Sequence, residues 1–343
     1  AFFKIQENFA SIFTLGLIGD QKQRIYTDGK DNMLSIIPKD WEKPVKKMNY
    51  RCAKRIIQLA NTIGKDIDIH AEQNPREDAN DGFVRLFVVQ QHEGINKDEV
   101  EQTIMKIMSK DAEDEKWTGI DADVKILTLE HMMAARRLGF DSFFAPFNKV
   151  SKYQMTFLQG AVPEIDFFTK IILPIAESMK GDGRVALEIL KEYSPLLSKQ
   201  NTEKPYELYL KCREKAVDVA SMVNENKTIR EIVKIISDSQ LINLPNVVDR
   251  ASNLVSDDVK ESDDEELTAW VNTMDLPIEV IRKYDDYVNH RTRFDTHQGV
   301  KGLEFDRVLV IIDDSEAKGF MFSYDKLFGV KNLSETDINN MAG

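Results

Sequence analysis

Three short stretches of the sequence hold polar and aromatic side chains that could bind a nucleotide or a nucleic acid. The first is GDQKQRIY at 19–26, where Gln23 could orient a water molecule or a phosphate oxygen and Tyr26 could stack on a base. It follows the apolar run at 13–18, which predicts a strand, and parallel α/β sheets bind ligands where their strands end. A polar turn after a core strand explains the same residues, so this stretch alone leaves both interpretations open.

The second stretch is NYRCAKRIIQLAN at 49–61. Asn49 is suited to cap a helix, which would place Tyr50 and Arg51 in its first turn. An aromatic ring beside a guanidinium suits a nucleotide, because the ring stacks on the base and the guanidinium holds a phosphate. A buried tyrosine next to a surface arginine on an amphipathic helix is the alternative.

The third stretch, THQGVKGLEFDRVLVIID at 296–313, is the most specific of the three. Gly299 and Gly302 permit a close approach of the backbone or a positive φ. Lys301 supplies a positive charge, and Glu304 supplies an acceptor for hydroxyl groups. The apolar residues that follow predict a strand that holds this loop in place.

Between residues 48 and 150, the sequence predicts helices and strands in alternation. Helical spacing of apolar residues predicts helices after residue 48 and over 97–110, the second with Val100, Ile104, Ile107 and Met108 on one stripe. FVRLFVVQ at 83–90 and VKILTL at 124–129 predict strands, and EHMMAARRLG predicts a helix directly after the latter. This alternation indicates an α/β fold with a parallel sheet and helices on its faces.

The pattern over 151–289 is almost entirely helical. In TIREIVKIISDSQ, apolar residues fall at helical spacing at Ile229, Ile232, Val233 and Ile236. The apolar run RVLVIID at 307–313 predicts a buried strand. The simplest architecture returns this strand to the sheet that holds 124–129, with the helical segment inserted between them.

Composition narrows the class of protein. The chain has 343 residues, a net charge of −12 and two cysteines. A uniformly acidic surface repels phosphate, so a nucleic-acid site must be a local basic groove. The low cysteine count argues against a disulfide scaffold, and no apolar run approaches the ~20 residues of a bilayer helix. We therefore expect a cytoplasmic protein with no membrane partner.

Taken in order, the three stretches resemble the third, fourth and fifth motifs of the UvrD/Rep/PcrA family of superfamily-one DNA helicases. The resemblance implies a RecA-like motor domain of the P-loop NTPase type with a large inserted helical subdomain. Residues 1–47 would end the first motor domain. Residues 48–150 and 290–343 would form the second motor domain, and 151–289 its helical insert.

The resemblance also implies roles at the nucleotide. ATP and Mg²⁺ would be the cofactors, bound mainly by parts of the parent protein outside this chain. Gln23 and Arg51 would act in catalysis, Gln23 by sensing the γ-phosphate and Arg51 by contacting it. Tyr50 would pack on the adenine, and Glu304 would bind the ribose or the network on the phosphate side.

At the DNA, the resemblance implies contacts from Tyr26, which would stack on a base, and from Thr296, His297 and Lys301. The partners would be single-stranded DNA and duplex junctions, with a protein partner possible through the helical insert. The resemblance implies that the parent protein is an ATP-dependent DNA helicase or translocase that moves 3′ to 5′.

The sequence holds no GxxxxGK[ST] phosphate loop, and the motif with the catalytic arginine would follow Gly343. We therefore expect a fragment of a longer protein that does not hydrolyse ATP alone. Three alternatives stay open: a helicase-like module that binds DNA or protein without ATPase activity, a helicase–nuclease subunit, and an unrelated α/β protein.

Overall fold

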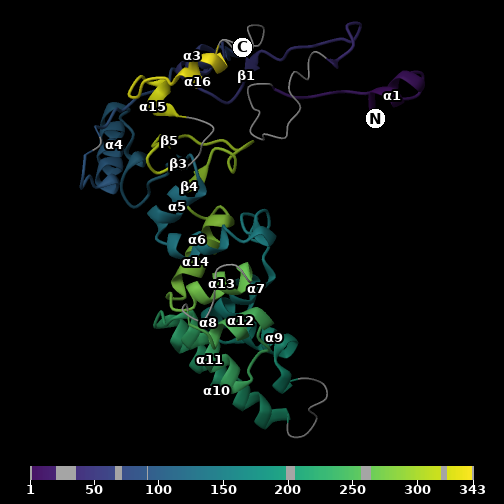
Figure 1. The fold of residues 1–343 in the computed structure, drawn as a ribbon, viewed down its shortest axis with the longest axis vertical. Coiled ribbons are helices and arrows are strands. Elements are labelled where there is room, and N and C mark those ends of the chain that lie inside the picture. Colours follow the sequence, from purple (N-terminus) through teal and green to yellow (C-terminus); the bar gives the residue numbers. More distant parts are fainter. Residues whose placement is uncertain are drawn as a thin grey trace. The chain divides into compact units, whose positions relative to one another are not determined.

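The computed structural model describes residues 2–20, 36–65, 72–90, 92–197, 205–255, 264–317 and 323–341. Two compact units make up the chain, residues 1–118 and residues 119–343. Both contain helices and short parallel strands (Figure 1), which confirms the mixed α/β class. The boundary between the units falls inside the predicted segment 48–150, and the four-part division stays a prediction.

The first unit contains short elements joined by long connections. They are α1 (Phe2–Asn8), β1 (Met48–Asn49), α3 (Lys54–Gly64), β2 (Asn74–Pro75), α4 (Lys97–Asp111) and the 3-10 helix η2 (Glu115–Trp117). β1 and β2 are parallel, with Met48 opposite Asn74.

Helix α4 forms where the sequence predicts a helix. Asn96 caps it, because its side-chain oxygen accepts the N–H of Glu99 at 3.3 Å, and acidic residues in the first turn favour the positive end of the helix dipole. The predicted stripe is only partly buried: Met108 is buried, whereas Ile107 is exposed. The buried side of the helix is turned toward Met105 instead.

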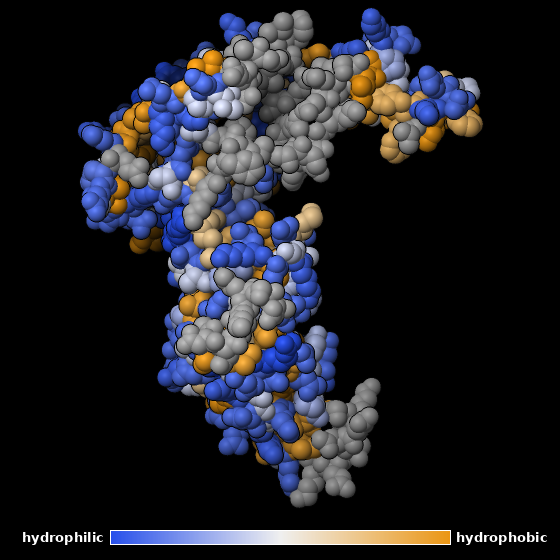
Figure 2. Space-filling view, in the orientation of Figure 1, coloured by the Kyte–Doolittle hydropathy of each residue, from blue (hydrophilic) through white to orange (hydrophobic). Residues whose placement is uncertain are grey.

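Two predicted strands of the first unit are wrong. Residues 13–18 and 83–90 are described throughout and form no strand. A strand needs a neighbouring backbone for its N–H and C=O groups, and β propensity alone does not supply one. Apolar side chains of both segments stay at the surface: Leu17 is 43% exposed and Val88 is 86% exposed. Helix α1 adds further apolar surface (Figure 2), since Phe2 is 67% exposed.

Three parallel strands form the sheet of the second unit: β3 (Lys125–Thr128), β4 (Phe294–Thr296) and β5 (Val308–Ile311). β3 lies in the middle, with Ile126 opposite Phe294 on one side and Leu309 on the other. The prediction that the last strand returns to the sheet that holds 124–129 is therefore confirmed. A helical segment separates β3 from β4 in the sequence.

The prediction that 307–313 is a buried strand is half right. β5 forms, but it lies at the edge of the sheet, and alternate residues stay exposed: Val308, Val310 and, just beyond the strand, Ile312. Side chains of a strand point alternately to the two faces of a sheet, so an apolar run is buried only where both faces are covered.

Helices fill the rest of the second unit. They are α5 (His131–Leu138), α6 (Asp141–Phe147), α7 (Pro163–Asp166), α8 (Leu173–Ser178), α9 (Arg184–Tyr193), α10 (Pro205–Asn224), α11 (Ile229–Ser239), α12 (Asn246–Ser252), α13 (Glu265–Thr273), α14 (Glu279–Val288), α15 (Tyr324–Leu327) and α16 (Glu335–Met341). Shorter turns of other helical types are η3 (Ser151–Tyr153), the π-helix η4 (Phe167–Ile172) and η5 (Pro195–Leu197).

Helix α11 confirms the prediction for 229–236. The four apolar residues of its stripe are fully buried: Ile229, Ile232, Val233 and Ile236. Thr228 and Glu231 form a capping box, in which each side chain accepts the backbone N–H of the other residue. Aromatic side chains also fill the core of this unit, with Phe157 stacked on Tyr284 at 4.7 Å between ring centroids.

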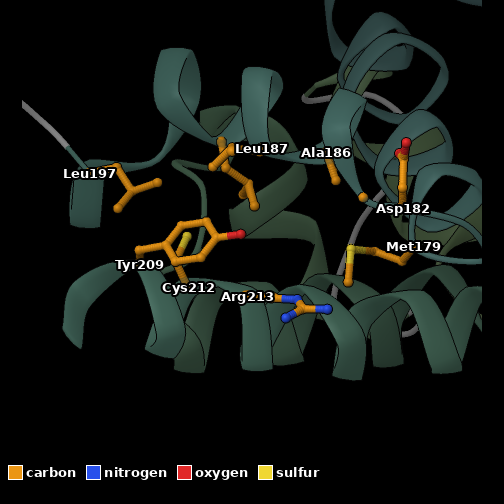
Figure 3. Close-up of a pocket in the computed structure, with 10 residues that line it drawn as sticks. Met179, Asp182, Ala186, Leu187, Leu197, Tyr209, Cys212 and Arg213 are labelled. Carbon is orange, nitrogen blue, oxygen red and sulfur yellow. The ribbon is translucent and has the colours of Figure 1, made fainter. Parts of the chain in front are cut away.

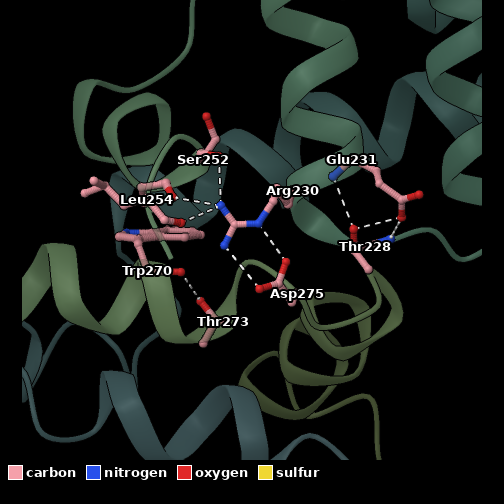
Figure 4. A network of polar contacts seen from close by, with 9 residues as sticks. Thr228, Arg230, Glu231, Ser252, Leu254, Trp270, Thr273 and Asp275 are labelled. Carbon is pink, nitrogen blue, oxygen red and sulfur yellow. Dashed lines mark hydrogen bonds and ion pairs between the residues drawn. The ribbon is translucent and has the colours of Figure 1, made fainter. Parts of the chain in front are cut away.

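The guanidinium of Arg230, a side chain that is 13% exposed, ties the end of α12 to α11 and to the turn after α13 (Figure 4). Arg230 donates to the backbone carbonyls of Ala251, Ser252 and Leu254, at 2.7–3.2 Å, and to the carboxylate of Asp275. The C-terminal carbonyls of a helix have no partners within the helix, so Arg230 supplies donors to carbonyl groups at and just beyond the end of α12. The helical segment is thus joined by specific polar contacts as well as by apolar packing.

Candidate functional site

Two of the predicted site residues lie outside the described residues. They are Gln23 and Tyr26, which belong to the first motif-like stretch.

Tyr50 and Arg51 lie in a turn that directly follows β1. The side-chain oxygen of Asn49 accepts the backbone N–H groups of Arg51 at 3.0 Å and Cys52 at 2.9 Å. Both predicted binding residues have exposed side chains, and the ring of Tyr50 is 70% exposed. They are therefore available to a ligand on this unit.

The prediction that Asn49 caps the following helix, with Tyr50 and Arg51 in its first turn, is wrong. Helix α3 begins at Lys54, and Ala53 is its flanking residue. The Asn49 side chain already binds the two amides of a tight local turn, so the chain enters the helix only after that turn is complete. The aromatic ring and the guanidinium consequently project from a turn.

A network of amide side chains holds this turn. Asn49 donates through Nδ2 to Oε1 of Gln73 at 2.7 Å. Asn61, at the other end of the stretch, exchanges two hydrogen bonds with the Gln73 backbone, at 2.8 and 2.9 Å. Gln73 thus joins both ends of the 49–61 stretch. Nothing in the sequence around Gln73 indicated this role.

The third stretch leaves the sheet at the carboxyl end of β4. Thr296 closes the strand and is buried, and its hydroxyl oxygen accepts the N–H of Gly299 at 3.3 Å. His297, Lys301 and Glu304 follow with exposed side chains. The loop thus buries one of the predicted DNA contacts and leaves the other polar residues exposed along its course from the carboxyl end of β4 to the amino end of β5.

Both glycines of this loop are used as the sequence predicts. Gly302 has a φ of +87°, a conformation that side chains disfavour. Gly299 allows a close approach, since a Cβ there would lie 2.1 Å from Oδ1 of Asp295. The loop is therefore packed directly onto the Asp295 carboxylate.

Asp295 is the centre of a buried polar cluster that sequence reasoning missed. Its Oδ2 lies 3.2 Å from Nζ of Lys125 on β3 and 2.8 Å from Nδ1 of His290, and its Oδ1 accepts the N–H of Thr296 at 2.9 Å. The Lys125 and Asp295 side chains are only 8% and 4% exposed. Lys125 also donates to the carbonyl of Thr292 at 3.2 Å. The cluster joins β3, β4 and the segment that leads into β4.

His131 begins α5, directly after β3 at the same edge of the sheet. Its Nδ1 lies 2.7 Å from the hydroxyl of Tyr287. Burial lowers the pKa of the His131 imidazole; the Asp295 carboxylate opposes this shift, and the His297 ring adds to it. His131 is therefore a neutral hydrogen-bonding group at pH 7, close enough to Asp295 and His297 to respond to their charge.

A pocket lies elsewhere in the second unit, between α9, α10 and the connection that leads from α8 to α9 (Figure 3). Met179, Leu187 and Tyr209 line it, with Arg213 at its rim, and it measures about 320 Å³ including its open mouth. Cys212 lies at its wall, where burial raises the pKa of the thiol. A protonated thiol is a weak nucleophile, so the pocket offers no evident chemistry.

Neither the turn nor the loop forms a metal site by itself. Within the ranges that the structure describes, no three His, Cys, Asp or Glu side chains are placed to hold a metal ion. The chemistry that these residues can supply is hydrogen bonding, aromatic stacking and positive charge. These are the interactions that bind nucleotides and nucleic-acid strands.

Comparisons of the chain with protein-family models, with curated proteins and with solved structures give no match. Among the described helices, none has the length and apolar character needed to cross a membrane.

Proposed function

We propose that the chain is part of an ATP-dependent DNA helicase or translocase of the UvrD type, moving 3′ to 5′ on single-stranded DNA. One observation carries the proposal. The loop with the most specific motif-like sequence, 296–304, leaves the carboxyl end of a strand in a parallel sheet, where α/β proteins bind ligands. The order of the three stretches supports it further, as does a helical segment between two neighbouring strands of that sheet.

On the nucleotide side, the proposal assigns Tyr50 to the adenine and Arg51 to the γ-phosphate. Their exposure and the turn held by Asn49 fit a nucleotide, since neither side chain is committed to the core. Bound ATP would supply the free energy of phosphate-bond hydrolysis. The guanidinium would stabilise negative charge on the phosphate, a role that makes arginine strongly favourable at such sites. Gln23 and Glu304 complete the proposed nucleotide contacts.

On the DNA side, the proposal assigns contacts to Tyr26 and to the loop residues Thr296, His297 and Lys301. Thr296 is buried here, so its contribution would come through the backbone of the loop that it anchors or after a movement of that loop. Movement requires that ATP favour one arrangement over another, because a ligand that binds both equally shifts nothing. The proposed cofactors stay ATP and Mg²⁺.

The test is Arg51→Ala in the full-length protein that we expect to contain this chain. DNA-stimulated ATPase should fall on the order of 10³-fold or more, since an arginine at the transferring phosphate is worth that much. The matched control is Arg76→Ala, which removes another exposed arginine of the same unit, paired with Asp78 at 3.3 Å. The control should keep its ATPase activity.

Two results would count against the proposal. Wild-type turnover in Arg51→Ala would remove the role assigned to that residue. A full-length protein that binds DNA but shows no ATPase activity would favour the alternative, a helicase-like module that binds DNA or protein without a motor function.

A further inference from the structure

Positive charge is concentrated in residues 43–55, just before and within the turn that holds Arg51. This stretch has six lysine and arginine residues and no aspartate or glutamate. It contributes +6 to a chain whose net charge is −12, so the other 330 residues together carry −18. A local basic segment on an acidic protein attracts a polyanion to one place and repels it elsewhere.

The cations at the start of this stretch are presented to solvent. Lys43, Lys46 and Lys47 lie in a segment without helix or strand that leads into β1, and their side chains are exposed. Arg51 is exposed in the turn that follows. The backbone is anchored nearby, because the carbonyl of Lys47 accepts the N–H of Asn74 at 2.7 Å. The charges therefore project from a held backbone.

These four cations also lack acidic partners among the residues that the structure describes, in contrast to many surface lysines of the chain. Lys170 and Lys180, for example, are each paired with a carboxylate at 2.7 Å. The later cations of the stretch are engaged: Lys54 lies 3.8 Å from Asp81, and the Arg55 guanidinium lies over the Phe83 ring. An unpaired cation is available to a phosphate without first breaking an ion pair.

We propose that Lys43, Lys46 and Lys47 form a contact surface for the phosphate backbone of single-stranded DNA. The choice of DNA over another polyanion rests on the proposed function, whereas the surface itself rests on the charge and exposure of these residues. Each lysine that binds a phosphate releases a condensed counterion, so binding should depend steeply on salt. The surface adds DNA contacts on the first unit to those proposed for the loop at 296–304.

The experiment measures binding of a fluorescent oligo(dT) to the chain by anisotropy, without nucleotide, over a range of salt concentrations. The variant is K43Q/K46Q/K47Q. The matched control is K191Q/K211Q/K234Q, which changes net charge equally by replacing three exposed lysines of the helical segment. Circular dichroism and thermal denaturation establish that both variants keep the wild-type fold.

The expected result follows from counterion release. Three lost phosphate contacts should reduce the slope of log K against log salt by about 2, since each contact to a single strand contributes ~0.7. The same relation gives roughly 100-fold weaker binding at 0.1 M salt. The control variant should stay close to wild type.

Three outcomes would overturn the proposal. Equal weakening in both variants would mean that binding follows total charge and not this surface. If an oligoglutamate of the same charge displaced oligo(dT) equally well, the surface would bind polyanions in general and would not be a DNA contact. A folded wild-type chain that binds no oligo(dT) would overturn both this surface and the DNA half of the proposed function.

The inference and the proposed function can fail separately. Loss of oligo(dT) binding in the lysine variant alone supports the surface even if Arg51→Ala leaves ATPase activity unchanged. Unchanged oligo(dT) binding in the lysine variant overturns the surface and leaves the ATPase prediction as it was.

Discussion

Replacement of Asp295 by asparagine removes one charge from the buried cluster while keeping the shape of the side chain. Asp295 is 4% exposed and faces Lys125, which is 8% exposed, at 3.2 Å. Removing one partner of a buried ion pair costs ~3–5 kcal/mol, because the other charge is left without compensation in a poorly solvated place. Lys125 keeps two favourable contacts, with the Thr292 carbonyl and with the Phe305 ring, so we expect the lower end of that range.

Hydrogen exchange is the suitable assay, because the chain has two units and unfolding of the whole is not a simple two-state process. A loss of about 3 kcal/mol corresponds to exchange on the order of 100-fold faster at amides that exchange by opening of β3 and β4. The matched control is Asp286→Asn, which removes a carboxylate paired with Arg291 at 2.8 Å at the surface. An exposed pair of this kind contributes only ~0–1 kcal/mol.

A double-mutant cycle with Lys125→Met isolates the interaction free energy between Asp295 and Lys125. The Asp295→Asn, Lys125→Met double variant should be more stable than the sum of the single effects by ~0.5–3 kcal/mol, since the uncompensated ammonium is gone. Unchanged exchange in β3 and β4 of Asp295→Asn, or strictly additive effects in the cycle, would refute the reasoning that this ion pair holds the sheet and its loop.

Two further predictions concern the same edge of the sheet. Gly299→Ala should lower the melting temperature, with a loss of roughly 1–3 kcal/mol, because the added Cβ would clash with Oδ1 of Asp295 and force the loop to shift. Gly16→Ala controls for the added methyl group, since a Cβ there meets no atom within 4 Å. Equal melting temperatures of Gly299→Ala and wild type would contradict the close packing. His131 has a pKa below its usual 6.5 in the folded chain, so the unfolded chain binds more protons, and stability should fall as pH drops below about 6.5, levelling off once the pH is below the folded pKa. Urea denaturation between pH 7.5 and 5 measures this, and the same pH dependence in His131→Gln would show that another group is responsible.

Parts of the fold could be predicted because they depend on neighbouring residues. The stripe at Ile229, Ile232, Val233 and Ile236 is buried as its spacing predicts, since a helix repeats every 3.6 residues and needs only one apolar face. The strand over 125–128 and the helix after it were also recognisable, as was the return of the last strand to the same sheet. The short strands at 48–49 and 74–75 were not, because two residues carry no periodicity.

The candidate site also has features that the sequence predicted and features that it did not. The sequence predicted that Gly299 and Gly302 would allow a close approach or a positive φ, and both occur. It did not predict Asp295 and Lys125 as partners, because 170 positions of chain separate them and only the register of parallel strands brings them together. It also misjudged Asn49, whose side chain closes a turn and does not cap a helix.

The sequence by itself determined local preferences: which segments become helices, where glycine is required, and where charge is concentrated at 43–55. Only the tertiary structure decided which apolar runs find partners. Residues 83–90 and 308–311 have similar β propensity, yet only the second pairs with β3, because a strand forms when another backbone offers hydrogen bonds in register. The buried cluster around Asp295 likewise exists because folding brings distant charges to one edge of a sheet, where each compensates the other.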